Sequence, residues 1–525
     1  MITPVKSALI SVTDKTNLIP LAKVLADKGV KLISTGGTAK ALTAAGFQVT
    51  AVEELTGNPE AFGGRMKSIS FQIASGLLFR RGHAQDEVEA NKLKIPKIDL
   101  VICNLYDFEQ YVGKNQNEES LVEEIDIGGP LMIRAGAKNY HSVAVLTDPS
   151  QYTKFTEHLN NHFGTTQEYR RTLACEAFDR IARYDAAIAE ELGSRFNPER
   201  TDKFVSLSKV QDLRYGENPH QKASWFNWKN AKTDGMAQVK ILQGKELSYN
   251  NLLDADAAWK SMSDVHELFN QGFTATVIKH GNPCGLSHGI SALNTLNEAW
   301  KGDEVSSFGG IVALSFEVDL KTAEFFDERF IEIVMAPAFT PDARNHFTKK
   351  KNVRLLELPL RSRLSQEKTL RSFHGGVLMQ DEDETLAPAS SYVTKTDKKF
   401  SEKQHHLINF GILACKHLKS NGIALVGEHN ETISLVGAGM GQPNRLDSLH
   451  LLAAHRAKKK DVNFEQLVLI SDAFFPFADS IEAAHQYGIK FIIQPGGSIR
   501  DQEVIQKANE CGMAMLFTNE RHFRH

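Results

Sequence analysis

The stretch VKLISTGGTAKALTAAG, residues 30–46, decides the fold of the first part of the chain. It starts with an apolar run typical of a buried strand, continues through a Gly-Gly turn and ends with helical spacing. Further apolar runs occur at residues 8–12 (ALISV), 97–106 (KIDLVICNLY) and 142–148 (SVAVLTD). Strands of this kind that alternate with helices predict a parallel sheet covered on both faces, and therefore an α/β fold.

The chain has 525 residues, more than a single hydrophobic core usually spans, so we expect at least two domains. A helical pattern over residues 167–192 leads into the polar segment SRFNPERTDK, where we place a boundary between domains 1–198 and 199–525. The second domain contains a loose repeat, in which the order strand, turn, helix, strand occurs twice. We therefore predict two tandem α/β subdomains, approximately 199–380 and 400–525, joined by a polar connector.

Composition excludes several classes of function. Lys and Arg total 61 against 64 Asp and Glu, which gives a net charge of −3 and no general affinity for nucleic acid or a membrane surface. No apolar run approaches the roughly 20 residues that cross a bilayer, and no signal peptide is visible. The five cysteines are scattered, which is typical of a reduced compartment, so we expect a cytoplasmic protein.

Two loops at the ends of predicted strands suit a bound anion. Residues 34–38 (STGGT) join a strand to a helix, so glycine N–H groups and the helix N-terminus converge there. Residues 11–16 (SVTDKT) form a second such turn, with Lys15 as a counter-charge. Each loop alone is equally well explained as a capped helix, whereas two together favour a ligand crevice. Residues 61–68 (AFGGRMKS) and 124–139 (EIDIGGPLMIRAGAKN) add Gly-Gly pairs followed by cations.

One pattern in the second part suits proton transfer. In VIKHGNPCGLS, residues 277–287, Lys279 and His280 end an apolar strand directly before a Gly-Asn-Pro turn. A histidine beside a cation at a strand end favours acid–base chemistry over a structural role. A zinc deaminase site is excluded, because His280 lacks the Glu two residues on and Pro283-Cys284 lacks the second cysteine. We expect no metal to be required for catalysis.

Two further segments are rich in hydrogen-bonding or aromatic side chains. Residues 213–223 (LRYGENPHQKA) place Arg, Tyr, Asn and His in one loop with Gly and Pro. Residues 471–484 (SDAFFPFADSIEAA) combine phenylalanines with aspartates. This second combination suits a flat heteroaromatic ring such as a pterin, and it equally suits an aromatic cluster in the core.

Together these segments resemble the bifunctional AICAR transformylase/IMP cyclohydrolase family over nearly the whole chain. The resemblance is carried by the ordered set SVTDKTNL, STGGTAKAL, IDIGGP, RAGAKN, LRYGENPHQ, KHGNPCG, SSFGGIVALS, SDAFFPFADS and TNERHFRH. It implies a methylglyoxal-synthase-like cyclohydrolase domain at 1–198 and two tandem cytidine-deaminase-like subdomains without zinc, carrying the transformylase, at 199–525. It also implies a homodimer with shared transformylase sites, and nucleotide and folate substrates.

The implied reactions are the last two steps of de novo purine biosynthesis. The co-substrate 10-formyltetrahydrofolate formylates the 5-amino group of AICAR, and formyl-AICAR then closes to IMP with loss of water. The resemblance implies that His280 relays the proton, Lys279 stabilises the oxyanion and Asn421 orients the formyl group. The other implied transformylase residues bind the substrate (Arg214, Tyr215, Asn251, Arg445, Arg521) or the folate (Asp479, Phe474).

The resemblance implies a second set of residues for the cyclohydrolase. Cyclisation is intramolecular, so this site mainly folds the substrate and stabilises an oxyanion. The implied catalytic residues are Lys67, Tyr106, Asp126 and Lys138. The implied phosphate- and substrate-binding residues are Ser11, Lys15, Ser34, Gly36, Gly37, Thr38 and Arg65.

One loop departs from the family pattern. The family usually has G-G-R-V-K-T-L-H-P where residues 63–71 are GGRMKSISF, so the His-Pro pair is missing, and Asp107 replaces the usual Pro. Because Lys67 and Tyr106 are kept, we expect cyclohydrolase activity to survive. Two alternatives stay open: a transformylase with an impaired cyclohydrolase half, and a non-catalytic nucleotide- or folate-binding protein. An intact Lys279-His280 pair disfavours the second.

Overall fold

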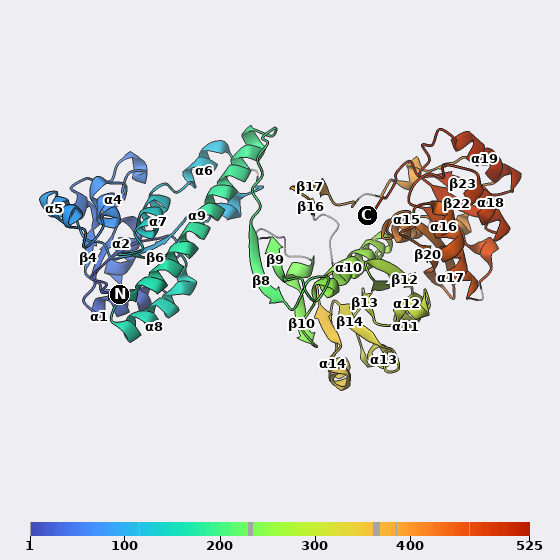
Figure 1. Cartoon of the computed structure of the whole chain (residues 1–525), viewed down its shortest axis with the longest axis horizontal. Coiled ribbons are helices and arrows are strands. Elements are labelled where there is room, and N and C mark those ends of the chain that lie inside the picture. The colour runs from blue at the N-terminus through green and yellow to red at the C-terminus, as the bar shows by residue number, and fades with distance from the viewer. Residues whose placement is uncertain (1, 115, 229–234, 361–367, 385, 461) are drawn as a thin grey trace. The chain divides into compact units, whose positions relative to one another are not determined.

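The chain folds as two compact units, Met1–Ser206 and Leu207–His525. The structure is a computed structural model and describes residues 2–114, 116–228, 235–360, 368–384, 386–460 and 462–525. The domain boundary expected from the sequence lay between residues 198 and 199. Each unit is described by itself below (Figure 1).

The first unit is built on a parallel five-stranded sheet. Its strands, in spatial order, are β4 (Val49–Ala51), β3 (Lys31–Ser34), β2 (Ser7–Val12), β5 (Leu100–Asn104) and β6 (Ala144–Leu146). All four neighbouring pairs are parallel. The α/β prediction is therefore confirmed, and four of the five strands fall within the apolar runs that the sequence singled out. Outside this sheet, β1 (Ile2–Thr3) pairs antiparallel with β7 (Thr165–Thr166).

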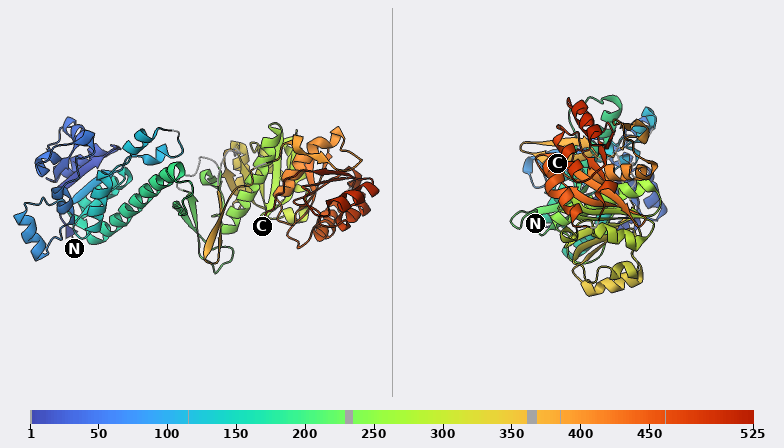
Figure 2. Two further views of the ribbon diagram at one scale, coloured as in Figure 1. Left: turned by 90° about the horizontal axis from the view of Figure 1, so that it is seen from above. Right: turned by 90° about the vertical axis from the view of Figure 1, so that its right-hand side faces the viewer.

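Helices cover both faces of this sheet, because alternate strand residues are buried on opposite sides. Helices α4, α7 and α9 pack on one face around Leu9 and Val101, and α1 and α8 pack on the other around Ile10 and Ile102. The long helix α9 runs beside the sheet in Figures 1 and 2. The helices of this unit are α1 (Leu18–Asp27), α2 (Gly36–Ala44), α3 (Val52–Thr56), α4 (Phe71–Leu78), α5 (Ala84–Lys92), α6 (Glu118–Glu123), α7 (Gly128–Lys138), α8 (Tyr152–His162) and α9 (Gln167–Phe196).

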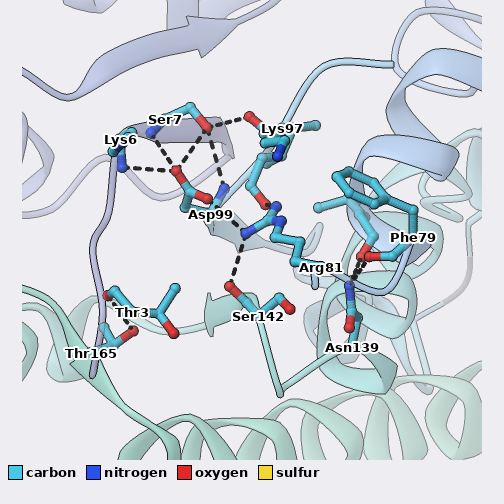
Figure 3. Close-up of polar contacts among 12 residues, drawn as sticks. Thr3, Lys6, Ser7, Phe79, Arg81, Lys97, Asp99, Asn139, Ser142 and Thr165 are labelled. Atoms are coloured by element: carbon cyan, nitrogen blue, oxygen red, sulfur yellow. Dashed lines mark hydrogen bonds and ion pairs between the residues drawn. The ribbon is translucent and has the colours of Figure 1, made fainter. Parts of the chain in front are cut away.

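A buried ion pair joins the starting ends of the strands, opposite to the predicted ligand loops (Figure 3). Arg81 Nη1 lies 2.6 Å from Asp99 Oδ1 and donates to the carbonyl of Ser142 at 3.0 Å. Asp99 Oδ2 accepts the N–H groups of Lys6 at 2.8 Å and Ser7 at 3.0 Å. One carboxylate and one guanidinium thus tie the beginnings of β2 and β5 to the segment that leads into β6.

The second unit contains one continuous mixed sheet, in which twelve strands of the described residues take part. In spatial order they are β10 (Lys240–Gln243), β15 (Arg354–Glu357), β14 (Ile331–Ala336), β13 (Gly310–Leu314), β11 (Phe273–Lys279), β12 (Asn282–Gly289), β20 (Thr432–Gly439), β19 (Ile423–His429), β21 (Val468–Ser471), β22 (Phe491–Gln494), β23 (Ala514–Phe517) and β18 (Val393–Thr394). Counted outward from the central pair β12 and β20, both halves have the same order: a hairpin, three parallel strands and an edge strand.

This arrangement confirms the internal repeat and the two tandem subdomains. In each half a hairpin (β11–β12 or β19–β20) is followed by two parallel strand pairs, and an antiparallel edge strand closes the half. The halves meet where β12 pairs antiparallel with β20, with Ser287 opposite Ser434 and Gly289 opposite Thr432. The short strand β18 lies within the stretch that the sequence suggested was only a polar connector, and it pairs with β23.

Equivalent helices cover equivalent faces of the two halves. Helix α10 packs on Ile278, Ile311 and Ile333, and α15 packs likewise on Val426 and Ile470. The helices of the second unit are α10 (Tyr249–Phe269), α11 (Ala292–Trp300), α12 (Glu304–Ser307), α13 (Leu320–Glu324), α14 (Pro341–Phe347), α15 (Glu402–Lys416), α16 (Arg445–Asp447), α17 (Ala454–Lys458), α18 (Asp479–Gln486) and α19 (Asp501–Glu510). Across the described parts of both units, every helix is too short or too polar to span a membrane.

Two hairpins of the second unit form small sheets of their own. They are β8 (Leu207–Leu213) with β9 (Ala223–Trp228), and β16 (Lys368–Phe373) with β17 (Gly376–Asp381). The second hairpin exposes large apolar side chains, with Phe373 at 55% and Val377 and Leu378 at 60% of their full accessibility. Apolar surface of this kind often marks a contact with another protein chain.

The Arg81–Asp99 pair generates a stability prediction. Asp99→Asn leaves a buried guanidinium without its counter-charge, which costs about 3 kcal/mol where one partner of a buried pair is removed. We expect the first unit to unfold at a markedly lower temperature in this variant, as followed by calorimetry.

The matched control is Asp27→Asn, which removes an exposed pair with Lys23 on α1. Exposed pairs contribute less than about 1 kcal/mol, so the control should unfold close to the unsubstituted protein. Equal unfolding temperatures for both variants would contradict the assigned role of Asp99.

Candidate active sites

A cavity of about 730 Å³ lies in the first unit, at the carboxyl ends of the parallel strands. This is the end of an α/β sheet where ligands usually bind. Its walls come from the loop after β2, the start of α2, residues 60–68, the end of β5 and the segment that leads into α7. The lining includes Ser11, Lys15, Gly36, Gly37, Thr38, Arg65, Lys67, Tyr106 and Asp126, all of which the sequence comparison with the family had suggested.

Two residues suggested for this site do not line the cavity. Ser34 is fully buried and its hydroxyl donates to the carbonyl of Ile10 on the neighbouring strand at 2.7 Å. Lys138 is exposed at the far end of α7, whose first turn is the part that reaches the cavity. Thr38 does line the cavity, but its hydroxyl is bonded to the backbone of Val12.

Asp126 is a half-buried carboxylate in the wall of the cavity. Its Oδ1 accepts the N–H of Gly129 at 2.9 Å, and its own N–H donates to the Tyr184 hydroxyl at 2.7 Å. A Cβ on Gly129 would lie 2.3 Å from Asp126 Oδ2, so only glycine allows this approach. Burial raises the pKa of Asp126 above its ordinary value, whereas the Gly129 N–H and the nearby charge of Lys67 act to lower it.

Asn104 is a cavity residue that the sequence analysis missed. It ends β5, and its Oδ1 accepts the N–H groups of Thr13 at 2.6 Å and Asp14 at 3.0 Å. Its Nδ2 donates to the carbonyl of Asp14 at 2.7 Å. The side chain therefore clamps the loop that carries Lys15. A polar residue at the end of the buried run LVICN was the available signal.

In the second unit, Lys279 and His280 lie at a tight hairpin turn between β11 and β12. Lys279 pairs with Asn282, so His280 and Gly281 are the two turn residues, and their φ angles are 54° and 72°. Two positive φ angles are typical of the type I′ hairpin turn. Asp254 of α10 accepts both turn N–H groups, from His280 at 3.1 Å and from Gly281 at 2.7 Å.

A cavity of about 170 Å³ lies beside this turn. It is lined by Lys279, His280, Asn282, Pro283, Cys284, Asp303, Ser306, Ala438, Met440 and Arg456. Lys279 Nζ donates to the carbonyl of Phe308 at 2.6 Å, and the His280 side chain is exposed. An imidazole and an ammonium group thus lie at an opening that residues of both halves of the sheet line.

Asn421 is connected to the same turn through Asn282. Asn282 Oδ1 accepts the N–H of Lys419 at 3.0 Å, while its Nδ2 donates to the carbonyl of His280 at 3.1 Å. Asn421 follows two residues later, and its Nδ2 donates to the carbonyl of Gln442 at 2.9 Å. The structure therefore brings Lys279, His280 and Asn421 into one neighbourhood from both halves of the repeat.

Two of the suggested arginines lie near this neighbourhood. Arg445 Nη2 lies 2.9 Å from Asp472 Oδ1, and Asp472 Oδ2 also accepts the hydroxyl of Ser420 at 2.6 Å. The guanidinium carbons of Arg445 and Arg521 are 5.7 Å and 4.7 Å from the ring centroid of Phe523. The C-terminal segment thus lies against the residue that precedes Asn421.

Of the remaining suggested substrate residues, Asn251 binds Glu332. Asn251 Nδ2 donates to Glu332 Oε2 at 2.9 Å, and Arg354 Nη1 lies 3.6 Å from the same oxygen. Burial lowers the pKa of Arg354, with the charge of Arg214 acting in the same direction. The guanidinium carbon of Arg214 is 5.3 Å from the Tyr215 ring centroid. Arg354 thus lies between the segment of Arg214 and Tyr215, whose charge it feels, and Glu332, which Asn251 binds.

The suggested folate residues lie between the end of β21 and the start of α18. Asp479 is its first residue and is exposed, and its Oδ1 accepts the N–H and hydroxyl of Ser480. Phe474 retains 36% of its accessibility, whereas Phe475 is fully buried in the core. The core interpretation of this segment thus fits Phe475, and the ring-binding interpretation is left to Phe474. Helix α18 packs against α16, which begins at Arg445.

Comparison with known proteins adds a family to this geometry. Residues 17–131 match the MGS-like domain, and residues 136–456 match the family described as AICARFT/IMPCHase bienzyme. The chain belongs to the AICARFT/IMPCHase bienzyme family. Similar proteins include the Bifunctional purine biosynthesis protein PurH of Halalkalibacterium halodurans (41% identity) and of Bacillus subtilis strain 168 (40%), each covering 99% of this chain and 100% of the relative. The protein of that name from Prochlorococcus marinus strain NATL2A is 42% identical and covers 99% of both chains.

The two family matches cover most of the residues that line the two cavities. The MGS-like match contains the cavity residues from Gly36 to Asp126, and the bienzyme match contains the β11–β12 turn and Asn421. It also agrees with the suggested methylglyoxal-synthase-like first domain. In the part of the chain that the structure describes, His, Cys, Asp and Glu side chains nowhere gather in a group of three or more that could hold a metal ion.

The environment of Asp126 generates a titration prediction. Lys67→Met removes the nearby positive charge, so the pKa of Asp126, already raised by burial, should rise further. The measurement is a pH titration of the Asp126 carboxyl carbon by NMR in aspartate-labelled protein. Lys138→Met is the control, because Lys138 lies outside the cavity and its loss should leave the titration unchanged. An unchanged Asp126 pKa in Lys67→Met would show that the two side chains do not interact.

Proposed function

We propose that this chain carries both activities of its family, one in each unit. The second unit transfers the formyl group of 10-formyltetrahydrofolate to the 5-amino group of AICAR. The first unit closes the resulting formyl-AICAR to IMP, with loss of water. The observation that carries the proposal is that Asn282 joins the Lys279-His280 turn to the segment of Lys419, two residues before Asn421, in a chain that matches bifunctional relatives over its full length.

In the proposed transfer, the 5-amino nitrogen attacks the formyl carbon of the folate. Lys279 stabilises the oxyanion that forms, by the electrostatic logic of other acyl transfers. The bond between the formyl carbon and folate N10 then breaks, and His280 relays the amine proton towards that leaving nitrogen. Asn421 orients the formyl group. Because the 5-amino group is a poor nucleophile, the exposed His280 and the nearby cation are the groups this step needs most.

In the proposed cyclisation, the carboxamide nitrogen attacks the formyl carbon within one molecule. The carboxamide and formamide nitrogens each give up one proton, and the formyl oxygen leaves as water. Lys67 and the N–H groups near residues 64–67 bind the oxyanion, and Asp126 and Tyr106 lie in the same cavity to move protons. Lys138 lies outside this cavity, so we assign it no direct part in the reaction.

Substrate binding follows from the charges at each cavity. In the first unit, Lys15, Arg65 and the start of α2 at Gly36-Gly37 bind the phosphate, because a helix N-terminus attracts anions. In the second unit, Arg214, Tyr215, Asn251, Arg445 and Arg521 hold AICAR. Asp479, the first residue of α18, and Phe474, in the segment before that helix, are both exposed and bind the folate.

We further propose that the protein works as a cytoplasmic homodimer. The exposed apolar side chains of the β16–β17 hairpin support a second copy as the partner, because such surface is costly to leave in water. The five cysteines are free thiols, in keeping with a reducing compartment. Analytical ultracentrifugation that found only monomers would contradict the dimer.

A product assay tests the bifunctional proposal. Purified protein receives AICAR and 10-formyltetrahydrofolate, and formyl-AICAR and IMP are quantified over time. IMP as the main product is the expected result. Accumulated formyl-AICAR would mean that the 63–71 segment, which lacks the family His-Pro pair, has lost cyclisation. Neither product from folded protein would refute the enzymatic proposal.

His280→Ala separates the two activities. We expect formyl transfer to fall by about 10²- to 10⁴-fold, the usual contribution of general acid–base groups, while cyclisation of supplied formyl-AICAR continues unchanged. His429→Ala is the matched control, because His429 is exposed at the end of β19, the repeat's equivalent of β11. Equal transfer rates for the two variants would exclude a catalytic role for His280.

A further inference from the structure

The turn that carries His280 has a near copy in the other half of the sheet. Asn430 and Glu431 join β19 to β20, and their φ angles are 48° and 56°. The closing pair is His429 with Thr432, as Lys279 closes with Asn282 in the first half. The same type of turn thus occurs twice in the sheet. A feature that only the turn at His280 has is therefore not required to form the turn.

The two copies differ in what their N–H groups bind. The N–H groups of His280 and Gly281 both donate to the carboxylate of Asp254. Among the described residues, no side chain accepts the N–H groups of Asn430 and Glu431. In a hairpin turn these N–H groups point away from the strands, so water can satisfy them and the fold does not require a carboxylate there.

Helices α10 and α15 differ in the same respect, since only α10 has a carboxylate at the relevant position. Helices α10 and α15 begin with equivalent capping boxes, Ser248 with Asn251 and Ser401 with Gln404. Counted from these caps, the residue equivalent to Asp254 is Leu407, which is 4% exposed and part of the core. An apolar residue is therefore compatible with the fold at this position of α15, whereas α10 has a half-buried carboxylate there.

We propose that Asp254 is a positioning residue of the transformylase site, holding the turn so that His280 and Lys279 face the reacting groups. The proposal rests on the function proposed above. One carboxylate oxygen accepts the N–H of His280 and the other accepts the N–H of Gly281. Two bonds from one rigid group fix both the position and the orientation of the turn. The second anchor is Asn282, which holds the carbonyl of His280 and the N–H of Lys419. The turn is thereby fixed from α10 on one side and from the segment of Asn421 on the other.

The carboxylate of Asp254 does not favour folding by itself, because its position is partly buried. Burial raises the pKa of Asp254, and the charge of Glu332 acts in the same direction, whereas the two N–H groups and His280 act to lower it. Burial of a charge is opposed unless hydrogen bonds compensate it. The turn N–H groups supply that compensation, and in return the carboxylate restricts the motion of the turn.

The first test compares Asp254→Asn with a matched variant, Asp256→Asn, on the same helix. The side chain of Asp256 is half-exposed, and its carboxylate pairs with Lys260 rather than with the turn. In Asp254→Asn one of the two acceptor oxygens becomes an NH2 group that faces a turn N–H, so we expect kcat for formyl transfer to fall by about 10- to 100-fold, the effect of a small misplacement of reacting groups. KM for AICAR and the cyclisation rate should stay near the unsubstituted values. Asp254→Glu keeps both acceptors and should recover much of the lost rate.

The second test reads the turn directly and does not depend on activity. In the unsubstituted protein the amide of Gly281 should exchange with solvent more slowly than that of Glu431, and Asp254→Asn should remove this difference. Unchanged kcat in Asp254→Asn, or equal exchange at the two turns of the unsubstituted protein, would overturn the positioning role. If His280→Ala also transfers formyl at the full rate, the proposed function itself has failed; if only Asp254→Asn does, the failure is confined to this inference.

Discussion

The pairing of β12 with β20 is the contact on which the second unit depends. It joins two copies of one α/β arrangement into a single sheet, and it runs antiparallel, so each hairpin turn lies beside the far end of the other hairpin. The Lys279-His280 turn therefore lies next to the end of β20 and the segment that precedes β19. Neither half alone contains both His280 and Asn421. A site between two repeats follows from this register, because strand pairing fixes which residues are opposite.

Each repeat kept the fold and changed a few polar positions. The strands, the covering helices and the capping boxes of α10 and α15 are equivalent, and both cores are apolar. At the turns, however, one copy has Lys279 and His280 with the carboxylate of Asp254 bound to the turn. The other has Asn430 and Glu431, and Leu407 occupies the position of α15 equivalent to Asp254. Stability is supplied by the shared apolar pattern, which leaves the turn free to differ in chemistry.

The sequence predicted the architecture better than the contacts. Apolar runs identified β2, β3, β5 and β6, but β4 was missed, because its three residues are only half-buried and show no alternation. The loop STGGT indicated the cavity correctly, yet Ser34 bonds to a neighbouring strand, a contact that depends on β2 and β3 lying side by side. Asn104 and Asp254 escaped notice because their partners are backbone N–H groups of distant segments, which no residue pattern marks.

The two units, although built differently, hold a carboxylate in the same way. Asp126 and Asp254 are each half-buried near a cationic or basic side chain, and each accepts a backbone N–H group of a glycine. Both have a pKa raised above the unfolded value. The stabilisation linked to such groups is fully present only below their unfolded pKa and is lost as the pH rises through the folded pKa. At neutral pH both carboxylates therefore lower the stability of the fold, and residues retained against stability are those expected where a site needs charge in a fixed place.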